Sequence, residues 1–288
     1  MASLRTIRRR IRSVRNTSQI TKAMEMVAAS KMRRAQLRVM ASRPYSDRLR
    51  RLIADLAVRP GPEGMVQPLL RQRATRNRVG LVVMTSDRGL CGALNSNVLR
   101  RASMDILAAG GPQAVDLVTV GRRGQDFMLR RGIRLEATFT HLGDQPGILA
   151  VQPVARIIME EFTRGDIDAA FIVYPRFVNT LTQRVTVDQI LPVVPAAVEG
   201  PRLEYIFEPS APEILAELLP RYVEVQVYQA LLETIASEHS ARMIAMRNAT
   251  DNARELIASL TLSYNKARQA AITKEIAEIA VGAGALTG

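Results

Sequence analysis

The chain has 288 residues, 47% of them apolar, which is enough for one sizeable core or for a modest domain with extended elements. It has no Trp and a single cysteine, Cys91, which excludes a disulfide framework and a multi-thiolate metal site and favours a reducing compartment. The net charge of +13 comes from one end, because residues 1–51 hold 15 Lys/Arg and 2 Asp/Glu while the rest balances at 25 of each. This basic segment implies an acidic partner: nucleic acid, anionic lipid or an acidic protein surface.

Membrane and targeting signals are weak in this sequence. Apolar runs of about 18 residues are missing, so no membrane span is expected. The Arg-rich start has the composition of a transit peptide, but its pattern continues unbroken into a long helix, which argues against that reading.

Residues 1–56 are predicted to form an N-terminal coiled-coil helix. The segment has no Gly, and its one proline, Pro44, is compatible with a kink rather than an end. At about 1.5 Å per residue, the helix would reach about 75 Å. Apolar or small side chains recur every three or four residues, as in a coiled-coil seam. The seam is Leu4, Ile7, Ile11, Val14, Ser18, Thr21, Glu25, Ala28, Met32, Ala35, Val39 and Ser42. A Pro- and Gly-rich linker, 57–78, follows.

The central segment, 79–208, alternates between strand and helix patterns. Strands are predicted at 79–86, 114–121, 134–142, 167–179 and 182–194, and helices at 97–111, 121–132 and 148–166. The last two strands alternate in polarity as antiparallel neighbours do. This order predicts an open, Rossmann-like α/β domain with an antiparallel part.

The C-terminal segment, 209–288, is helical again from about residue 212 to 281, with Pro212 at its start and Pro220 inside it. Beyond Pro220, about 60 residues of helix would reach about 90 Å. Its seam is Tyr222, Val225, Gln229, Leu232, Ala236, His239, Met243, Met246, Thr250, Ala253, Ile257, Leu260, Tyr264, Ala267 and Ala271. Two helices this long stabilise each other by pairing. Since both join one compact domain, we expect an antiparallel coiled coil beside that domain.

Catalytic and nucleotide-binding motifs are missing from the sequence. Neither G-x-G-x-x-G nor G-x-x-x-x-G-K-[ST] occurs, so SDRGLCGAL after the first strand is interpreted as a tight strand-to-helix turn rather than a phosphate site. His141 and His239 lack metal-ligand neighbours at the usual spacing, and a structural role is expected for both. Cys91 is interpreted as a packing thiol. We therefore expect no catalytic residue, cofactor or metal, and no enzyme activity of the chain alone.

Three stretches resemble the gamma subunits of F-type ATP synthases, in their bacterial form. They are ITKAMEMVAASKMRRAQ at 20–36, TSDRGLCGALN at 85–95, and the C-terminal run from EHSARMIAMRNATDNARELI to EIAVGAGAL at 238–286. The resemblance implies a rotor shaft seated in an alpha3-beta3 hexamer, with a foot on the epsilon subunit and the membrane c-ring. Proton-driven rotation would force the catalytic beta subunits through their states. The implied location is peripheral, on the cytoplasmic face of the inner membrane.

The resemblance also implies contact residues. Rotor–stator contacts fall on Lys22, Met24, Lys31, Arg33, Arg242, Arg268, Gln269, Thr273 and Glu275, with Arg242 near Met24. Foot contacts to epsilon and the c-ring fall on Tyr205 and Glu208. Ala and Met suit a surface of low relief, and exposed ion pairs worth about 0–1 kcal/mol exchange without deep traps.

Two alternatives remain open on the residues themselves. The first is a basic nucleic-acid-binding protein with an α/β core, although no aromatic residue for base stacking occurs before Tyr45. The second is a nucleotide-dependent enzyme, which would need a phosphate site that the motifs do not supply.

Overall fold

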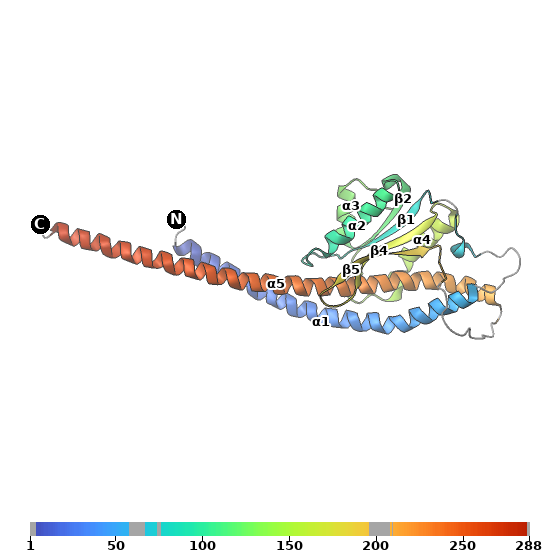
Figure 1. Ribbon diagram of the computed structural model, residues 1–288, viewed down its shortest axis with the longest axis horizontal. Helices are drawn as coiled ribbons and strands as arrows, with labels where there is room; N and C mark the ends of the chain where they lie inside the picture. Colours follow the sequence, from blue (N-terminus) through green and yellow to red (C-terminus); the bar gives the residue numbers. More distant parts are fainter. Residues whose placement is uncertain (1–3, 58–66, 74–75, 196–207, 209, 287–288) are drawn as a thin grey trace. The chain divides into compact units, whose positions relative to one another are not determined.

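The computed structural model describes residues 4–57, 67–73, 76–195, 208 and 210–286, with side chains described as far as Val281 (Figure 1). Two long helices dominate these residues: α1 (Leu4–Ala57) and α5 (Ala211–Leu286). Pro44 and Pro220 both lie inside helix. Within the described parts of the chain, no helix is long and apolar enough to cross a membrane.

A five-stranded sheet forms the centre of the unit made by residues 28–242. Its order is β3-β2-β1-β4-β5, with β1 parallel to β2 and β4, β2 parallel to β3, and β5 antiparallel to β4. The strands are β1 (Val79–Met84), β2 (Val115–Val120), β3 (Ala137–Phe139), β4 (Ala169–Phe177) and β5 (Gln183–Leu191). The predicted fold class, with long helices around a mixed Rossmann-like sheet, is confirmed.

Helices cover both faces of this sheet (Figure 1). They are α2 (Leu94–Ala108), α3 (Arg122–Arg130) and α4 (Gln152–Arg164), with 3-10 turns η1 (Pro68–Leu70), η2 (Pro112–Ala114) and η3 (Ile148–Ala150). Because side chains alternate along a strand, β1 supplies both layers. Leu81 and Val83 pack with α2 and α3, whereas Val82 and Met84 pack with α4 and α5.

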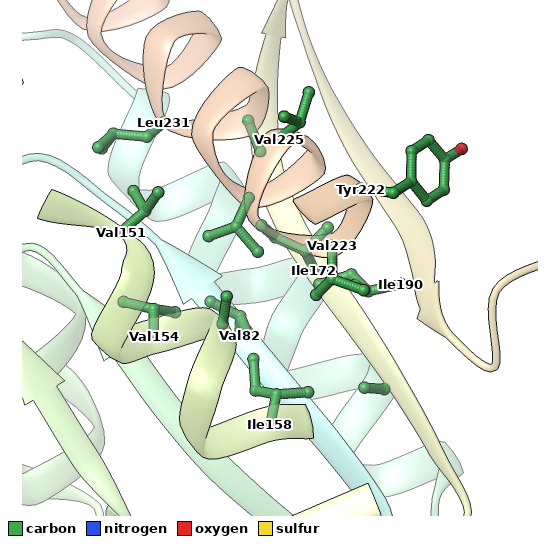
Figure 2. Packing of buried hydrophobic residues seen from close by; sticks show 14 of the residues in the cluster. Val82, Val151, Val154, Ile158, Ile172, Ile190, Tyr222, Val223, Val225 and Leu231 are labelled. Atoms are coloured by element: carbon green, nitrogen blue, oxygen red, sulfur yellow. The ribbon is translucent and has the colours of Figure 1, made fainter. Parts of the chain in front are cut away.

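The larger core lies on the α4–α5 side. Figure 2 shows Val82 and Ile172 of the sheet close to Val154 of α4 and Val223 of α5. The later part of α1 joins the same cluster through residues such as Val39 and Ile53. This part of α1 and the first part of α5 therefore belong to the body of the domain rather than to a separate shaft.

The second unit, residues 1–27 with 243–288, is a helix pair where it is described. Thr21 and Thr250 share a 2.7 Å hydrogen bond between their buried hydroxyls, and Glu25 lies 3.1 Å from Arg247. From Thr21 to Glu25 along α1, the contact partner on α5 moves back from Thr250 to Arg247, so the two helices run antiparallel. The predicted seam residues are the buried ones: Ile7, Thr21 and Glu25 on α1, and Met243, Met246, Thr250 and Ala253 on α5.

Candidate interaction surface

The carboxyl edge of the parallel strands is where open α/β sheets bind ligands, and here it is closed. Asp87, in the turn after β1, accepts hydrogen bonds from the backbone N–H groups of Arg122 and His141, both at 2.9 Å. Leu231, Thr234 and other α5 residues cover the same edge, leaving a cavity of about 40 Å³. Ligand pockets hold about 300–1,000 Å³, so this edge has no room for a nucleotide.

Arg242 is buried, with 9% of its surface exposed. Its guanidinium donates to the carbonyl of Gly89 from Nη2 at 3.1 Å and from Nε at 3.4 Å. Nη2 also pairs with Glu238 at 2.6 Å. Burial raises the pKa of Glu238, and the adjacent Arg242 opposes that rise. The predicted contact residue Arg242 thus makes its polar contacts within its own chain.

Lys31 also pairs within the chain. Its Nζ lies 2.6 Å from Asp144, whose other oxygen lies 3.1 Å from Nε2 of His239. Burial lowers the pKa of His239 to about 4, so the ring is neutral at pH 7. Burial alone would raise the pKa of Asp144, but Lys31 and His239 hold it below its ordinary value. Arg33, two residues along α1 from Lys31, is exposed.

On the helix pair, Lys22 and Met24 of α1 precede the buried Glu25. Glu25 receives Lys22 at 3.0 Å and Arg247 at 3.1 Å, and the hydrogen bond from Lys22 is the main cause of its lowered pKa. Met24 is half-buried, while Met26 is 59% exposed. This stretch of α1 therefore carries cations and flexible apolar side chains at its surface.

The end of α5 carries the most regular exposed pattern. Arg268, Gln269, Thr273 and Glu275 are all exposed, and so are Ile272, Ile276 and Ile279. At about 100° per residue, the isoleucines form one stripe with Arg268 and Glu275 along one side and Gln269 and Thr273 along the other. All described side chains from 272 to 281 are exposed. The i, i+4, i+7 spacing of this isoleucine stripe is already visible in the sequence.

The predicted foot residues are only partly described. Glu208 is exposed, and Tyr205 lies outside the described residues. Within the described parts of the chain, no group of three or more His, Cys, Asp or Glu residues is placed to hold a metal ion.

Comparisons with known proteins agree on one family. A family model described as ATP synthase matches residues 3–286. The chain is 53% identical over 291 residues to an ATP synthase gamma chain of Chloroflexus aurantiacus, with all of both chains covered. It is 50% identical over 287 residues to that of Dehalococcoides mccartyi, with 99% of this chain and 100% of the relative covered.

Solved structures give the same fold. A chain of the central stalk and c-ring structure of the Tetrahymena thermophila mitochondrial ATP synthase matches with a TM-score of 0.60 and 26% identity, covering 80% of this chain and 99% of that one. A chain of the Euglena gracilis mitochondrial ATP synthase matches with a TM-score of 0.69, covering 98% of this chain and 94% of that one. At 21% identity, the second match supports the fold alone.

Proposed function

Because this chain belongs to the family of ATP synthase gamma chains, we propose that it is the central rotor shaft of a proton-translocating, bacterial-type F-type ATP synthase. Its partners are the alpha3-beta3 hexamer, the epsilon subunit and the membrane c-ring. It couples rotation of the ring to ATP synthesis or hydrolysis in the beta subunits, and it has no catalytic site of its own. Its place is peripheral, on the cytoplasmic face of the inner membrane.

The observation that carries this proposal is the exposed end of α5. The half-buried seam of the helix pair runs on α5 through Ile257, Leu260, Tyr264 and Ala267 to Ala271, and beyond it residues 272–281 are exposed. Ile276 is 61% exposed and Ile279 is 71% exposed. An apolar stripe bordered by polar side chains on both sides is suited to a socket in which contacts form and break as the helix turns.

The closed strand edge supports a non-catalytic role. Leu231 and Thr234 of α5 lie where a nucleotide would bind in a doubly wound domain. In the proposed assembly, ATP chemistry belongs to the beta subunits and this chain supplies only mechanical coupling. A nucleic-acid-binding role, the alternative raised by the basic charge, receives no support from the relatives.

On this proposal, the predicted contact residues form three groups. The end of α5 contacts the hexamer through Arg268, Gln269, Thr273 and Glu275. The helix α1 contacts it through Lys22, Met24 and Arg33. Lys31 contributes through an amine that Asp144 already partly holds. Tyr205 and Glu208 contact epsilon and the c-ring.

Reconstitution with alpha, beta and epsilon subunits tests the proposal. We expect the chain to raise both the rate and the cooperativity of ATP hydrolysis. Equal rate and cooperativity in a complex assembled without the chain would refute the rotor assignment.

A substitution on the α5 surface tests the contact face. Ile276→Ser is expected to weaken ATP-driven proton pumping at unchanged helix content. The matched control is Lys274→Ala, since Lys274 pairs with Glu278 at 3.5 Å on the other side of the same helix. Equal pumping by both variants and the wild type would remove the stripe from the contact surface.

A further inference from the structure

The turn between β1 and α2, residues 85–92, combines an exposed tip with a buried base. Leu90 has a positive φ of 63° and is 62% exposed, whereas Cys91, the chain's single cysteine, is 2% exposed. Ser86 donates to the carbonyl of Arg88 at 2.6 Å, and the side-chain amide of Asn95 donates to the Cys91 sulfur at 3.2 Å. These contacts fix the base of the turn beneath the projecting Leu90.

Arg242 binds the tip of this turn from α5. Its Nη2 and Nε both point at the carbonyl oxygen of Gly89, the residue before Leu90. Two donors on one acceptor restrain the orientation of the peptide that follows, and that peptide carries Leu90. A charged donor to a carbonyl is also a stronger hydrogen bond than a neutral one.

Glu238 holds the guanidinium in this position. It lies one helical turn before Arg242, at 2.6 Å, with 15% of its side chain exposed. Neighbouring residues of α5 bind other parts of the same unit: Ser237 donates to the carbonyl of Pro175 in β4 at 2.8 Å, and Ser240 donates to that of Thr180, in the loop after β4, at 2.6 Å. The stretch 237–242 therefore ties the 85–92 turn, strand β4 and the loop after β4 to one helix.

We propose that Arg242 is a positioning residue, which fixes the 85–92 turn so that Leu90 contacts the stationary subunits, rather than touching those subunits itself. The burial of Arg242 and the orientation of its donors carry the first half of this inference. The second half, contact by Leu90, rests on the proposed rotor function.

Cys91 supplies a native probe for the first half. In the reconstituted complex, the rate at which an uncharged maleimide labels Cys91, followed on the peptide that carries it, measures the opening of the turn. Arg242→Gln is expected to raise this rate about tenfold, because a hydrogen bond from a charged group is lost. Arg242→Lys, which keeps the charge but not the fork of donors, should fall between the two.

The matched control is Arg247→Gln, on the same helix, where the arginine binds Glu25 instead of the turn. It should label at the wild-type rate. Labelling of Arg242→Gln at the wild-type rate would overturn the proposal. If that variant does not fold, Glu238→Gln replaces it with a smaller expected rise of about threefold, and no rise would count equally against the proposal.

A double-mutant cycle tests the second half through proton pumping per ATP hydrolysed. If Arg242 acts through Leu90, then Leu90→Ser and Arg242→Gln each lower pumping, and together they lower it no further than the more severe single change. Additive losses would overturn this half. Faster Cys91 labelling with unchanged pumping in both single variants would overturn it as well. The rotor assignment itself is tested separately, by the rate and cooperativity of ATP hydrolysis in a complex assembled without this chain.

Discussion

Glu161 on α4 predicts a pH dependence of stability that can be worked out from its surroundings. It is 4% exposed, and its Oε2 has no hydrogen-bond partner among the described residues. Burial, together with the negative charges of Asp116 and Glu136, raises its pKa from 4.5 to about 7. The folded chain therefore holds a proton there that the unfolded chain releases near pH 4.5.

The sign follows from linkage. Because the folded state binds the proton more tightly, the stabilising effect is complete below pH 4.5 and declines as the pH rises towards 7. At about 1.4 kcal/mol per pKa unit, the free energy of unfolding falls by about 3 kcal/mol over that interval. Glu161→Gln, which stays neutral, should match the wild type within about 1 kcal/mol at pH 4.5 and exceed its stability by about 3 kcal/mol at pH 8.

Urea unfolding of the full chain at pH 4.5, 6, 7 and 8 measures this difference. Titrating groups that do not interact with Glu161 contribute equally to both proteins, so they cancel when the two free energies are subtracted. A difference that does not change with pH would show that folding does not raise the pKa of Glu161. The reasoning from its burial would then be wrong.

Three further changes test other contacts. Glu25→Gln should lower the free energy of unfolding by about 1 kcal/mol at pH 7, a small amount because Lys22 and Arg247 are half exposed. Well below pH 4.5 it should change nothing, because a lowered pKa stabilises the fold only while the carboxylate is ionised. Thermal unfolding at both pH values measures the difference. Gly121→Ala should lower the free energy of unfolding by about 3 kcal/mol or more, because the added Cβ would lie 2.1 Å from the Thr85 carbonyl oxygen. The Cβ of Gly143→Ala would meet nothing within 4 Å, so this control should lose only about 1 kcal/mol for its positive φ. Thermal unfolding compares the two variants. The pKa of His239 is lowered to about 4, so the free energy of unfolding of the wild type should fall by about 3 kcal/mol as the pH drops from 6.5 to 4. His239→Gln should not show this decrease, and urea unfolding across that range tests it.

Much of the fold could be predicted from periodicity. The α1 seam was predicted from a three- and four-residue spacing, and its members Ile7, Glu25 and Val39 are buried. The strand predicted at 79–86 corresponds to β1 at Val79–Met84. A short apolar run that is rich in valine and ends at a turn is typical of a buried strand. The division of the chain at 56, 78 and 208 stays a prediction, because residues 58–66, 74–75, 196–207 and 209, near these boundaries, lie outside the described residues.

The candidate site was less predictable, because a sequence pattern does not say which way an exposed-type residue faces. Arg242 and Arg268 both lie on α5 and both carried the same predicted role, yet one is 9% exposed and the other is on the surface. The difference depends on the Gly89 carbonyl, 153 residues away in sequence, which only the tertiary fold brings within 3.1 Å. Local spacing cannot encode such a pairing.

Tertiary contacts also explain why the carboxyl edge of this sheet has only a small cavity. In an open α/β domain, the carboxyl edge of the strands is free, and backbone N–H groups there bind phosphate. In this chain, the Asp87 carboxylate takes the N–H groups of Arg122 and His141, and Leu231 and Ile235 of α5 help to close the space beside them. The N–H groups that could bind a phosphate are taken up by Asp87, and the edge of the sheet packs against the long helix instead of a ligand. A variant that reopened this edge, such as Leu231→Ala, would then weaken the attachment of α5 to the sheet before it created any nucleotide affinity.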